Sequence, residues 1–275
     1  MTEPETDTDD ALAEAYNAAL DLEKAGDLEA AVVAYQKVLE LDPADHGGVA
    51  VRLAAIGRGE TPAKAPDAYV ATLFDQHADV FDMILVDQLG YCVPLLVEDR
   101  LKELAPGPYP RLLDLGCGTG LSGEALEERT SFRVGVDISE GMIEVAHERE
   151  VYDELYVAEA GTFLETAKDG TPFDLIVATD VLPYLGDLEG FFAGVAANLA
   201  ANGVFGFSSE SLPDDVLAGR PYMVGPNQRF AHAGSYIERT LTAAGLARFH
   251  TEPITVRHQE GVPVPGDLVL ARKPA

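Results

Sequence analysis

Basic residues are scarce in this chain of 275 residues. Lysine and arginine number 19 against 47 aspartates and glutamates, which gives a formal charge of −28 at pH 7. Proteins that bind DNA or RNA neutralise phosphates with clustered lysine and arginine, and anionic lipid surfaces attract the same side chains. The charge balance therefore argues against nucleic acid and membrane surfaces as partners.

Cysteines and long apolar runs are also few. Cys92 and Cys117 are the two cysteines, and they form neither a disulfide framework nor part of a metal-ligand cluster. The first ten residues carry five acids and lack the apolar core of a signal peptide. No apolar run reaches the roughly 18 residues that a membrane-spanning helix needs. We therefore expect a reduced, cytoplasmic protein without a metal site.

The N-terminal region shows the apolar periodicity of helices after an acidic tail, which we expect to be disordered, at residues 1–10. Amphipathic helices are predicted over 11–24 and 28–41, where Asp10 offers an N-cap to the first and Asp42-Pro43 ends the second. The Gly26-Asp27 turn between them predicts a helical hairpin. A third helix over 48–56 would complete a helical region at 11–60.

The hairpin is similar to one tetratricopeptide repeat. The residues that carry the resemblance are Gly26–Ala31, Tyr35 and Pro43, with Ala18 and Ala19 placed where two helices would cross closely. A peptide-binding groove needs several stacked repeats. We therefore expect packing, capping or self-association from this hairpin, and a protein partner there stays open as an alternative.

A Gly- and Pro-containing linker at 57–67 leads to a second helical stretch over 68–104. Pro94 divides this stretch, because proline inside a helix removes a hydrogen bond and clashes with the preceding turn. Three prolines between Ala105 and Pro110 end it.

Beyond Pro110 the pattern alternates between strands and helices, which is typical of a doubly wound, Rossmann-like α/β fold with a mainly parallel sheet. We predict seven strands. The last two are expected to form a closing hairpin around the prolines of 261–266. The predicted strands are 111–115, 132–136, 154–158, 173–178, 203–207, 247–257 and 268–272, with helices at 122–129, 140–148, 162–167, 188–200 and 235–244.

A glycine-rich loop follows the first of these strands. Leu112–Leu115 runs into Gly116, Gly118 and Gly120, and glycine at such a turn lets a ligand approach the backbone closely. Asp114 precedes the loop and suits a ligand with an ammonium group. Asp137 ends the next strand, where a carboxylate can accept hydrogen bonds from both hydroxyls of a ribose.

These segments resemble the motifs of class I S-adenosylmethionine-dependent methyltransferases. The resemblance covers residues 111–208 in five stretches: Asp114–Gly120, Val136–Ser139, Val157–Ala160, Phe173–Leu182 and Leu199–Phe207. It implies a methyltransferase domain at 106–275 with an antiparallel last strand, preceded by a helical lid segment at 66–105. Together with the hairpin, the stretches Tyr69–Asp82 and Arg229–Tyr236 resemble a bacterial group of methyltransferases that carry such repeats.

The resemblance also implies roles for individual residues toward S-adenosylmethionine. Gly116, Cys117 and Gly118 would lie under its methionine part, with Asp114 facing the amino group and Asp137 the ribose. The remaining expected contacts are Glu159 and Ala160 at the adenine edge, Ile138 and Met142 on its faces, Thr179 near the methionine end, and Tyr69 and Phe74 in the lid.

The region after the fifth strand differs in charge from the rest of the chain. Between Leu212 and His258, five arginines stand against four acids. We expect Tyr184, Arg229 and His232 to bind the methyl acceptor, with His232 and Tyr236 as catalytic residues. A small, anionic acceptor fits this expectation, although the same arginines could simply pair with surface acids.

Four other functions are weighed against a small-molecule methyltransferase. The hairpin could recruit a protein substrate, or the domain could bind its cofactor as a non-catalytic module. A nicotinamide dehydrogenase is disfavoured by Asp114 and by the Gly-x-Gly-x-Gly spacing. A nucleic-acid methyltransferase is disfavoured by the charge and by Thr179-Asp180-Val181-Leu182, which stands where an Asn-Pro-Pro-aromatic motif would be expected.

Overall fold

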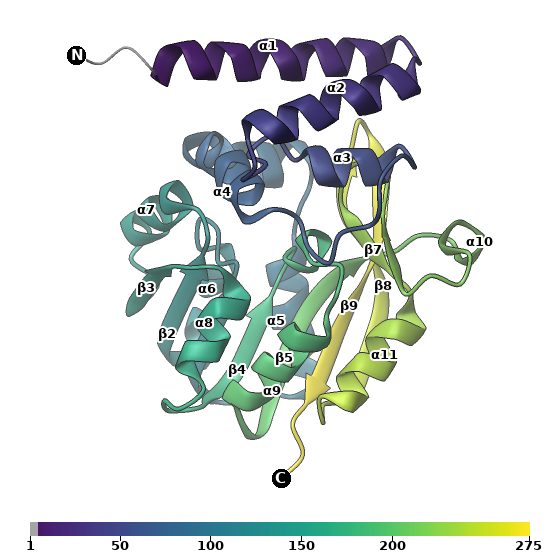
Figure 1. The fold of residues 1–275 in the computed structure, drawn as a ribbon. Helices are drawn as coiled ribbons and strands as arrows, with labels where there is room; N and C mark the ends of the chain where they lie inside the picture. The colour runs from purple at the N-terminus through teal and green to yellow at the C-terminus, as the bar shows by residue number, and fades with distance from the viewer. Residues whose placement is uncertain (1–4) are drawn as a thin grey trace.

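The computed structural model describes residues 5–275 (Figure 1). The first helix, α1 (Glu5–Lys24), begins six residues earlier than predicted. Part of the expected tail, 5–10, is therefore helical, and its first four residues lie outside the described part. Among the described residues, no helix is long and apolar enough to cross a membrane.

A helical hairpin forms at the N-terminus as predicted. Helix α2 (Leu28–Leu41) begins where the Asp27 carboxylate accepts a hydrogen bond from the Ala30 amide at 3.2 Å. Tyr35, Ala31 and Ala19 are fully buried where α1, α2 and the short α3 (Val49–Ala55) meet. The hairpin lies across the end of the molecule opposite the C-terminus (Figure 1).

The lid segment consists of four helical pieces. Helix α4 (Asp67–Asp75) is followed by a 3-10 turn, η1 (Ala78–Val80), and by a π-helical turn, η2 (Met83–Gln88). Helix α5 (Val93–Leu104) then carries Pro94 in its first turn, where the missing N–H costs no helical hydrogen bond. The predicted interruption at Pro94 is thus confirmed as the start of a new helix.

A parallel sheet forms the centre of the molecule. Its strands β1 (Tyr109–Leu115), β2 (Thr130–Asp137), β3 (Glu154–Val157), β4 (Phe173–Ala178) and β5 (Leu199–Glu210) are ordered β3-β2-β1-β4-β5. Beyond β5 lie the antiparallel β9 (Val262–Arg272) and then β8 (Ala247–Gln259), which confirms the predicted closing hairpin.

The prediction of seven strands is wrong by two. Strands β6 (Tyr222–Val224) and β7 (Phe230–His232) form a small hairpin that joins the sheet at Glu210. Each has three residues and lies in a stretch predicted to be loop, because strands this short show no readable alternation.

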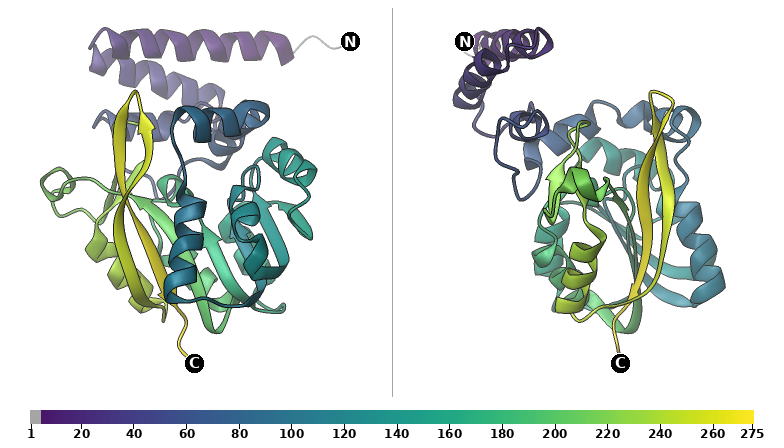
Figure 2. Two further views of the ribbon diagram at one scale, coloured as in Figure 1. Left: turned by 180° about the vertical axis from the view of Figure 1, so that it is seen from behind. Right: turned by 90° about the vertical axis from the view of Figure 1, so that its right-hand side faces the viewer.

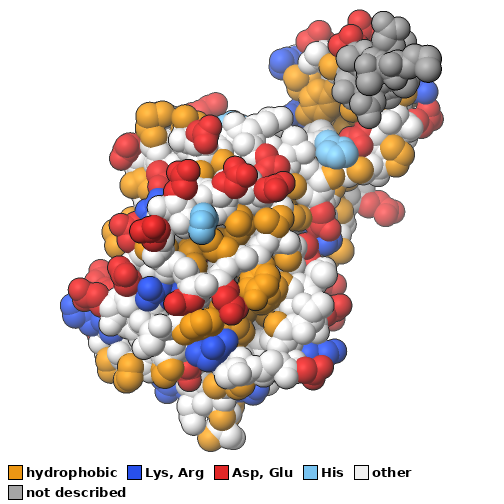
Figure 3. Space-filling view, turned by 90° about the vertical axis from the view of Figure 1, so that its left-hand side faces the viewer, with side chains coloured by type: hydrophobic (Ala, Val, Ile, Leu, Met, Phe, Trp, Pro, Cys, Tyr) orange, Lys and Arg blue, Asp and Glu red, His pale blue; other side chains and the backbone are white. Residues whose placement is uncertain are grey.

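Helices cover both faces of the sheet, so the strands are buried on two sides. Leu113 and Leu115 of β1 face a core with α8 (Ala160–Ala167), α9 (Glu189–Asn198) and α11 (Gly234–Ala243), whereas Leu112 faces α5 and β9. Figure 2 shows α5 on the opposite side of the sheet from these three helices. Acidic side chains predominate over basic ones on the face drawn in Figure 3. The remaining elements are α6 (Leu121–Ala125), η3 (Glu127–Arg129), α7 (Glu140–Glu148), η4 (Leu182–Tyr184) and α10 (Asp214–Leu217).

Candidate active site

The glycine loop connects β1 to α6 and bends through left-handed backbone. Gly116 has φ of 65° and Gly118 has φ of 52°, a region that side chains with a Cβ rarely adopt. A Cβ on Gly116 would come within 2.4 Å of the Val181 side chain, so this position also lacks room for one. A Cβ on Gly118 would have the ring of Phe81 as its nearest neighbour, at 3.9 Å, so the backbone there is open to a cavity.

The carboxylate of Asp137 joins the glycine loop to the end of β2. Its Oδ2 accepts a hydrogen bond from the Gly118 amide at 2.8 Å, and its Oδ1 accepts one from the Ser139 amide at 2.9 Å. Burial raises the pKa of this carboxyl against the effect of those hydrogen bonds. The two amides hold the carboxylate in one orientation at the wall of the cavity.

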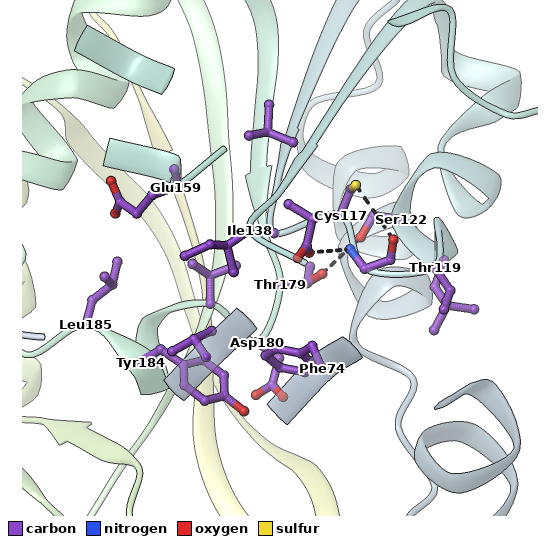
Figure 4. A pocket seen from close by; sticks show the side chains of 18 of the residues that line it. Phe74, Cys117, Thr119, Ser122, Ile138, Glu159, Thr179, Asp180, Tyr184 and Leu185 are labelled. Atoms are coloured by element: carbon purple, nitrogen blue, oxygen red, sulfur yellow. Dashed lines mark hydrogen bonds between the residues drawn. The ribbon is translucent and has the colours of Figure 1, made fainter. Parts of the chain in front are cut away.

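A pocket of about 940 Å³, open to solvent, lies at the carboxyl ends of β1, β2 and β4 beneath the lid segment (Figure 4). Ligands of doubly wound sheets bind at this edge. Ten of the predicted site residues line the pocket: Phe74, Gly116, Cys117, Gly118, Asp137, Ile138, Glu159, Ala160, Thr179 and Tyr184.

Glu159 caps helix α8 as well as lining the pocket. Its Oε2 accepts a hydrogen bond from the Thr162 amide at 2.7 Å, and its Oε1 lies 3.7 Å from the ammonium of Lys64. Cys117 also lines the pocket, but burial raises its pKa well above the ordinary value. The thiol is therefore protonated near neutral pH and is a poor nucleophile.

Three predicted cofactor contacts lie outside the pocket. Met142 of α7 is fully buried, and Tyr69 packs against Gly48 at the start of α3. Asp114 is fully buried behind the glycine loop, where the hydroxyl of Tyr152 donates to its Oδ2 at 2.6 Å. Its Oδ1 is buried without a hydrogen-bond partner among the described residues, and the predicted contact with a ligand's ammonium group stays a prediction. Burial raises the pKa of Asp114 to about 7.

The predicted catalytic pair, His232 and Tyr236, is buried in the protein and is not part of the pocket lining. His232 is 2% exposed, and its Nε2–H donates to the carbonyl of Leu185 at 2.8 Å. Desolvation lowers its pKa to about 4. The Tyr236 hydroxyl accepts a hydrogen bond from the Leu188 amide at 2.9 Å, and the two rings stack. The β6–β7 hairpin, which was not predicted, directs the His232 side chain inward. There His232 and Tyr236 form hydrogen bonds with the backbone of Leu185 and Leu188, in the loop after η4.

Arg229 is also placed differently from the prediction. Its Nε lies 2.6 Å from Glu210 and a terminal nitrogen lies 2.7 Å from Asp180, while another donates to the Tyr184 hydroxyl at 2.5 Å. Arg257 pairs with the same Glu210 at 2.7 Å. Both guanidinium groups are therefore neutralised behind the pocket wall and offer no free positive charge to a substrate.

The charged residues that line the pocket are mainly acidic. Lys64 is the one basic residue among the pocket-lining residues of the described chain, and it pairs with Asp67 at 2.8 Å. The acids there are Asp67, Asp137, Glu159 and Asp180. With Asp180 paired to Arg229 and Asp67 to Lys64, Asp137 and Glu159 leave the pocket net negative, which favours a cationic ligand over an anionic one.

Several pocket residues were not predicted. Asp180 could have been noticed, because it follows β4 by two residues at the ligand-binding edge. Phe81, Leu85 and Tyr91 lie among other apolar residues of the lid segment, and no sequence signal separates them from core residues.

Comparisons with known proteins agree with this geometry. Residues 113–205 match the family model described as a methyltransferase domain. The 18S rRNA (guanine-N(7))-methyltransferase RID2 of Arabidopsis thaliana is 52% identical over 69 residues, which are 24% of this chain and 24% of that protein. The ubiquinone biosynthesis O-methyltransferase of Bartonella quintana is 33% identical over 103 residues, which are 37% of this chain and 42% of that protein. The chain thus spans less than half the length of these curated relatives.

A solved structure has the same fold. The 1,6-didemethyltoxoflavin-N1-methyltransferase of Burkholderia thailandensis, with 1,6-didemethyltoxoflavin and S-adenosylhomocysteine bound, aligns with a TM-score of 0.56 at 17% identity. The alignment covers 78% of this chain and 93% of that one. The family match thus places a methyltransferase domain at residues 113–205, and the solved structure shares its fold. The sequence motifs described above predict S-adenosylmethionine as its cofactor.

The residues of the pocket fit this cofactor. The open backbone at Gly118 leaves room for its methionine part, and the fixed carboxylate of Asp137 can accept hydrogen bonds from ribose hydroxyls. Ile138 and Ala160 add apolar surface to the pocket that Glu159 also lines. The excess of carboxylates suits a ligand whose sulfonium is a cation.

Proposed function

We propose that this protein transfers a methyl group from S-adenosylmethionine to a small-molecule acceptor by direct displacement. The observation that carries the proposal is the apolar lining of the pocket beneath the lid. Phe74, Phe81 and Leu85 of the lid segment contribute this lining. A concave site with apolar walls accommodates a small molecule better than a polymer.

Within this pocket, the protein's part is to bind and to orient. S-adenosylmethionine supplies a methyl group on a sulfonium, which is a good leaving group without further activation. Asp137 would hold the ribose and Gly116–Gly118 would lie along the methionine part. Aromatic faces at Phe74 and Tyr184 would stabilise a dehydrated cation by roughly 0.5–2 kcal/mol. Alignment of the acceptor with the methyl carbon then supplies most of the rate acceleration.

The charge of the pocket supports a neutral or cationic acceptor. The arginines that suggested an anionic acceptor are paired with Glu210 and Asp180, as described above. The net charge of −28 likewise disfavours RNA, the substrate named in the description of the Arabidopsis relative.

The finer assignments made from sequence are part of this proposal. We infer that the chain belongs with the bacterial methyltransferases that carry a tetratricopeptide-like repeat, and that it works in the cytoplasm. The hairpin's buried core around Tyr35 supports a packing role, and recruitment of a protein substrate by the hairpin is the alternative.

Calorimetric titration tests the proposal directly. Wild type, Asp137→Ala and the exposed control Asp215→Ala are titrated with S-adenosylmethionine, S-adenosylhomocysteine and NAD. We expect micromolar binding of both adenosyl compounds in wild type and control, and at least tenfold weaker binding in Asp137→Ala. Binding of NAD alone, or of none of the three, would overturn the proposal. An acceptor screen that follows formation of S-adenosylhomocysteine would then identify the substrate.

A further inference from the structure

Asp180 occupies an unusual backbone position at the wall of the pocket. It lies two residues beyond β4 with φ of 60°, in the left-handed region that residues other than glycine rarely adopt. Its amide donates to the hydroxyl of Ser208 on β5 at 2.9 Å. Aspartate and asparagine tolerate this conformation better than other side chains, but it still has a cost. The fold keeps a strained residue at the edge where ligands bind.

Two arginines bind the carboxylate of Asp180 from the side that faces away from the pocket. Arg229 contacts its Oδ1 at 2.7 Å, and Arg257 lies 3.6 Å from the same oxygen. Arg229 also donates to the hydroxyl of Tyr184 and lies over that ring, 4.7 Å from its centroid. Because both arginines approach from the protein side, the Asp180 side chain is fixed while it still lines the pocket.

The surroundings of Asp180 on the pocket side are apolar and aromatic. Phe74 packs edge-on against Tyr184 at 5.4 Å and against Phe81 at 5.7 Å between ring centroids. Leu85, Tyr91 and Val181 also line the pocket. Figure 4 shows Asp180, Tyr184 and Phe74 close together, away from the Glu159 end of the pocket. A single fixed carboxylate among apolar walls is a strong determinant of which ligand polar group can bind there.

We propose that Asp180 selects the methyl acceptor by accepting a hydrogen bond from it. The acceptor is then a flat aromatic molecule that carries a hydroxyl or amine next to the atom to be methylated, or as that atom. A carboxylate at the same place has no proton to donate to Asp180, so acceptor would face acceptor, and it is rejected. This inference rests on the proposed function and assigns its substrate class.

Three probes with one ring system test the selection: naphthol, naphthylamine and naphthoate. Each is titrated into wild-type protein saturated with S-adenosylhomocysteine, and binding is measured by calorimetry. We expect naphthol and naphthylamine to bind at least tenfold more tightly than naphthoate. This comparison in wild type does not depend on any substitution.

Asp180→Asn then tests whether Asp180 is the selecting group. Asparagine keeps the left-handed backbone and the side-chain shape but removes the charge. We expect the preference over naphthoate to fall by about tenfold, with unchanged affinity for S-adenosylhomocysteine as the check on folding. Asp215→Asn on the exposed α10 makes the same chemical change at the surface and should leave the preference intact.

The outcomes separate this inference from the function on which it rests. Equal binding of naphthoate, or no binding of any probe to the loaded protein, overturns the inference and leaves the methyltransferase function standing. An unchanged preference in Asp180→Asn overturns the role of Asp180. Failure of S-adenosylhomocysteine itself to bind wild type overturns both.

Discussion

The carboxylate of Asp75, the last residue of α4, binds Ser139 at the start of α7. The Ser139 hydroxyl donates to Asp75 Oδ1 at 2.5 Å, and the amide of Gly141 donates to the same oxygen at 3.0 Å. Ser139 lies two residues after Asp137 and donates its own amide to that carboxylate. The lid is thus fastened directly to the loop that is proposed to hold the ribose.

A second acid fastens the lid to the glycine loop. Asp82 accepts a hydrogen bond from the hydroxyl of Thr119 and forms an ion pair with Arg149. The Nε–H of Arg149 donates in turn to the carbonyl of Thr119 at 2.8 Å. We expect these contacts between the lid and the pocket wall to slow the release of a bound cofactor.

Asp75→Asn is expected to accelerate release of S-adenosylhomocysteine. Loss of charge-assisted hydrogen bonds worth about 1 kcal/mol corresponds to roughly a fivefold rise in the dissociation rate. Stopped-flow fluorescence or surface plasmon resonance measures that rate. Asp79→Asn, an exposed change in the same segment, is the matched control, and equal rates in the two variants would contradict the role of the Asp75 contact.

Replacement of Arg229 by methionine is expected to destabilise the protein strongly. It would leave Asp180 without its nearest cation, whereas Glu210 would retain Arg257. Removal of one partner of a buried ion pair costs about 3–5 kcal/mol, and the remaining pair places this case toward the lower end. Urea unfolding measures the change. We expect Arg229→Met/Asp180→Asn to be more stable than the sum of the single losses predicts, and simple additivity would contradict this coupling.

Asp114→Asn is expected to stabilise the protein without ligand, increasingly as the pH rises toward 7. Burial raises the pKa of Asp114 to about 7, so the folded state holds a proton that the unfolded chain has released above its ordinary value near 4. The wild type therefore loses stability between about pH 4 and pH 7, and the variant lacks this loss. Between pH 5 and pH 7 the difference should grow by about 2 kcal/mol in urea unfolding. A difference that is independent of pH would refute this assignment.

His232 should give the opposite slope. Desolvation lowers its pKa to about 4, so below the ordinary value of 6.5 the unfolded chain takes up a proton that the folded state excludes. Stability is therefore lost as the pH falls from about 6.5 toward 4. Thermal and urea unfolding of His232→Gln should show a flatter acid limb than wild type. His147→Gln, on the exposed face of α7, should retain the wild-type slope.

The elements best predicted from sequence are those whose signals are local. Helix α7 spans the predicted 140–148 because Ser139 caps it, accepting the Met142 amide at 3.0 Å. All seven predicted strands are present, and Asp137 was found because it directly ends one of them. The glycine loop was recognisable for the same reason, because its own glycines permit the left-handed backbone that it adopts.

The parts missed from sequence depend on residues far apart in the chain. Asp180 meets Arg229 across 49 positions, and His232 meets Leu185 across 47. The sequence around Arg229 does not indicate that its guanidinium forms ion pairs with Glu210 and Asp180 and not with a substrate. The three-residue strands β6 and β7 decide which way these side chains turn, and they are too short to leave a periodic signal.

The contact between Tyr69 and Gly48 makes the hairpin and the lid mechanically continuous. A Cβ on Gly48 would come within 2.6 Å of the Tyr69 ring. The side chain of Tyr69, on α4, therefore packs directly against the backbone that starts α3. Helix α3 is in turn tied to α1 by the ion pair of Arg52 with Glu23 at 3.1 Å. A force on the hairpin is therefore transmitted to α4, the helix that covers the pocket. A partner bound to the hairpin would thus affect how ligands enter and leave the pocket.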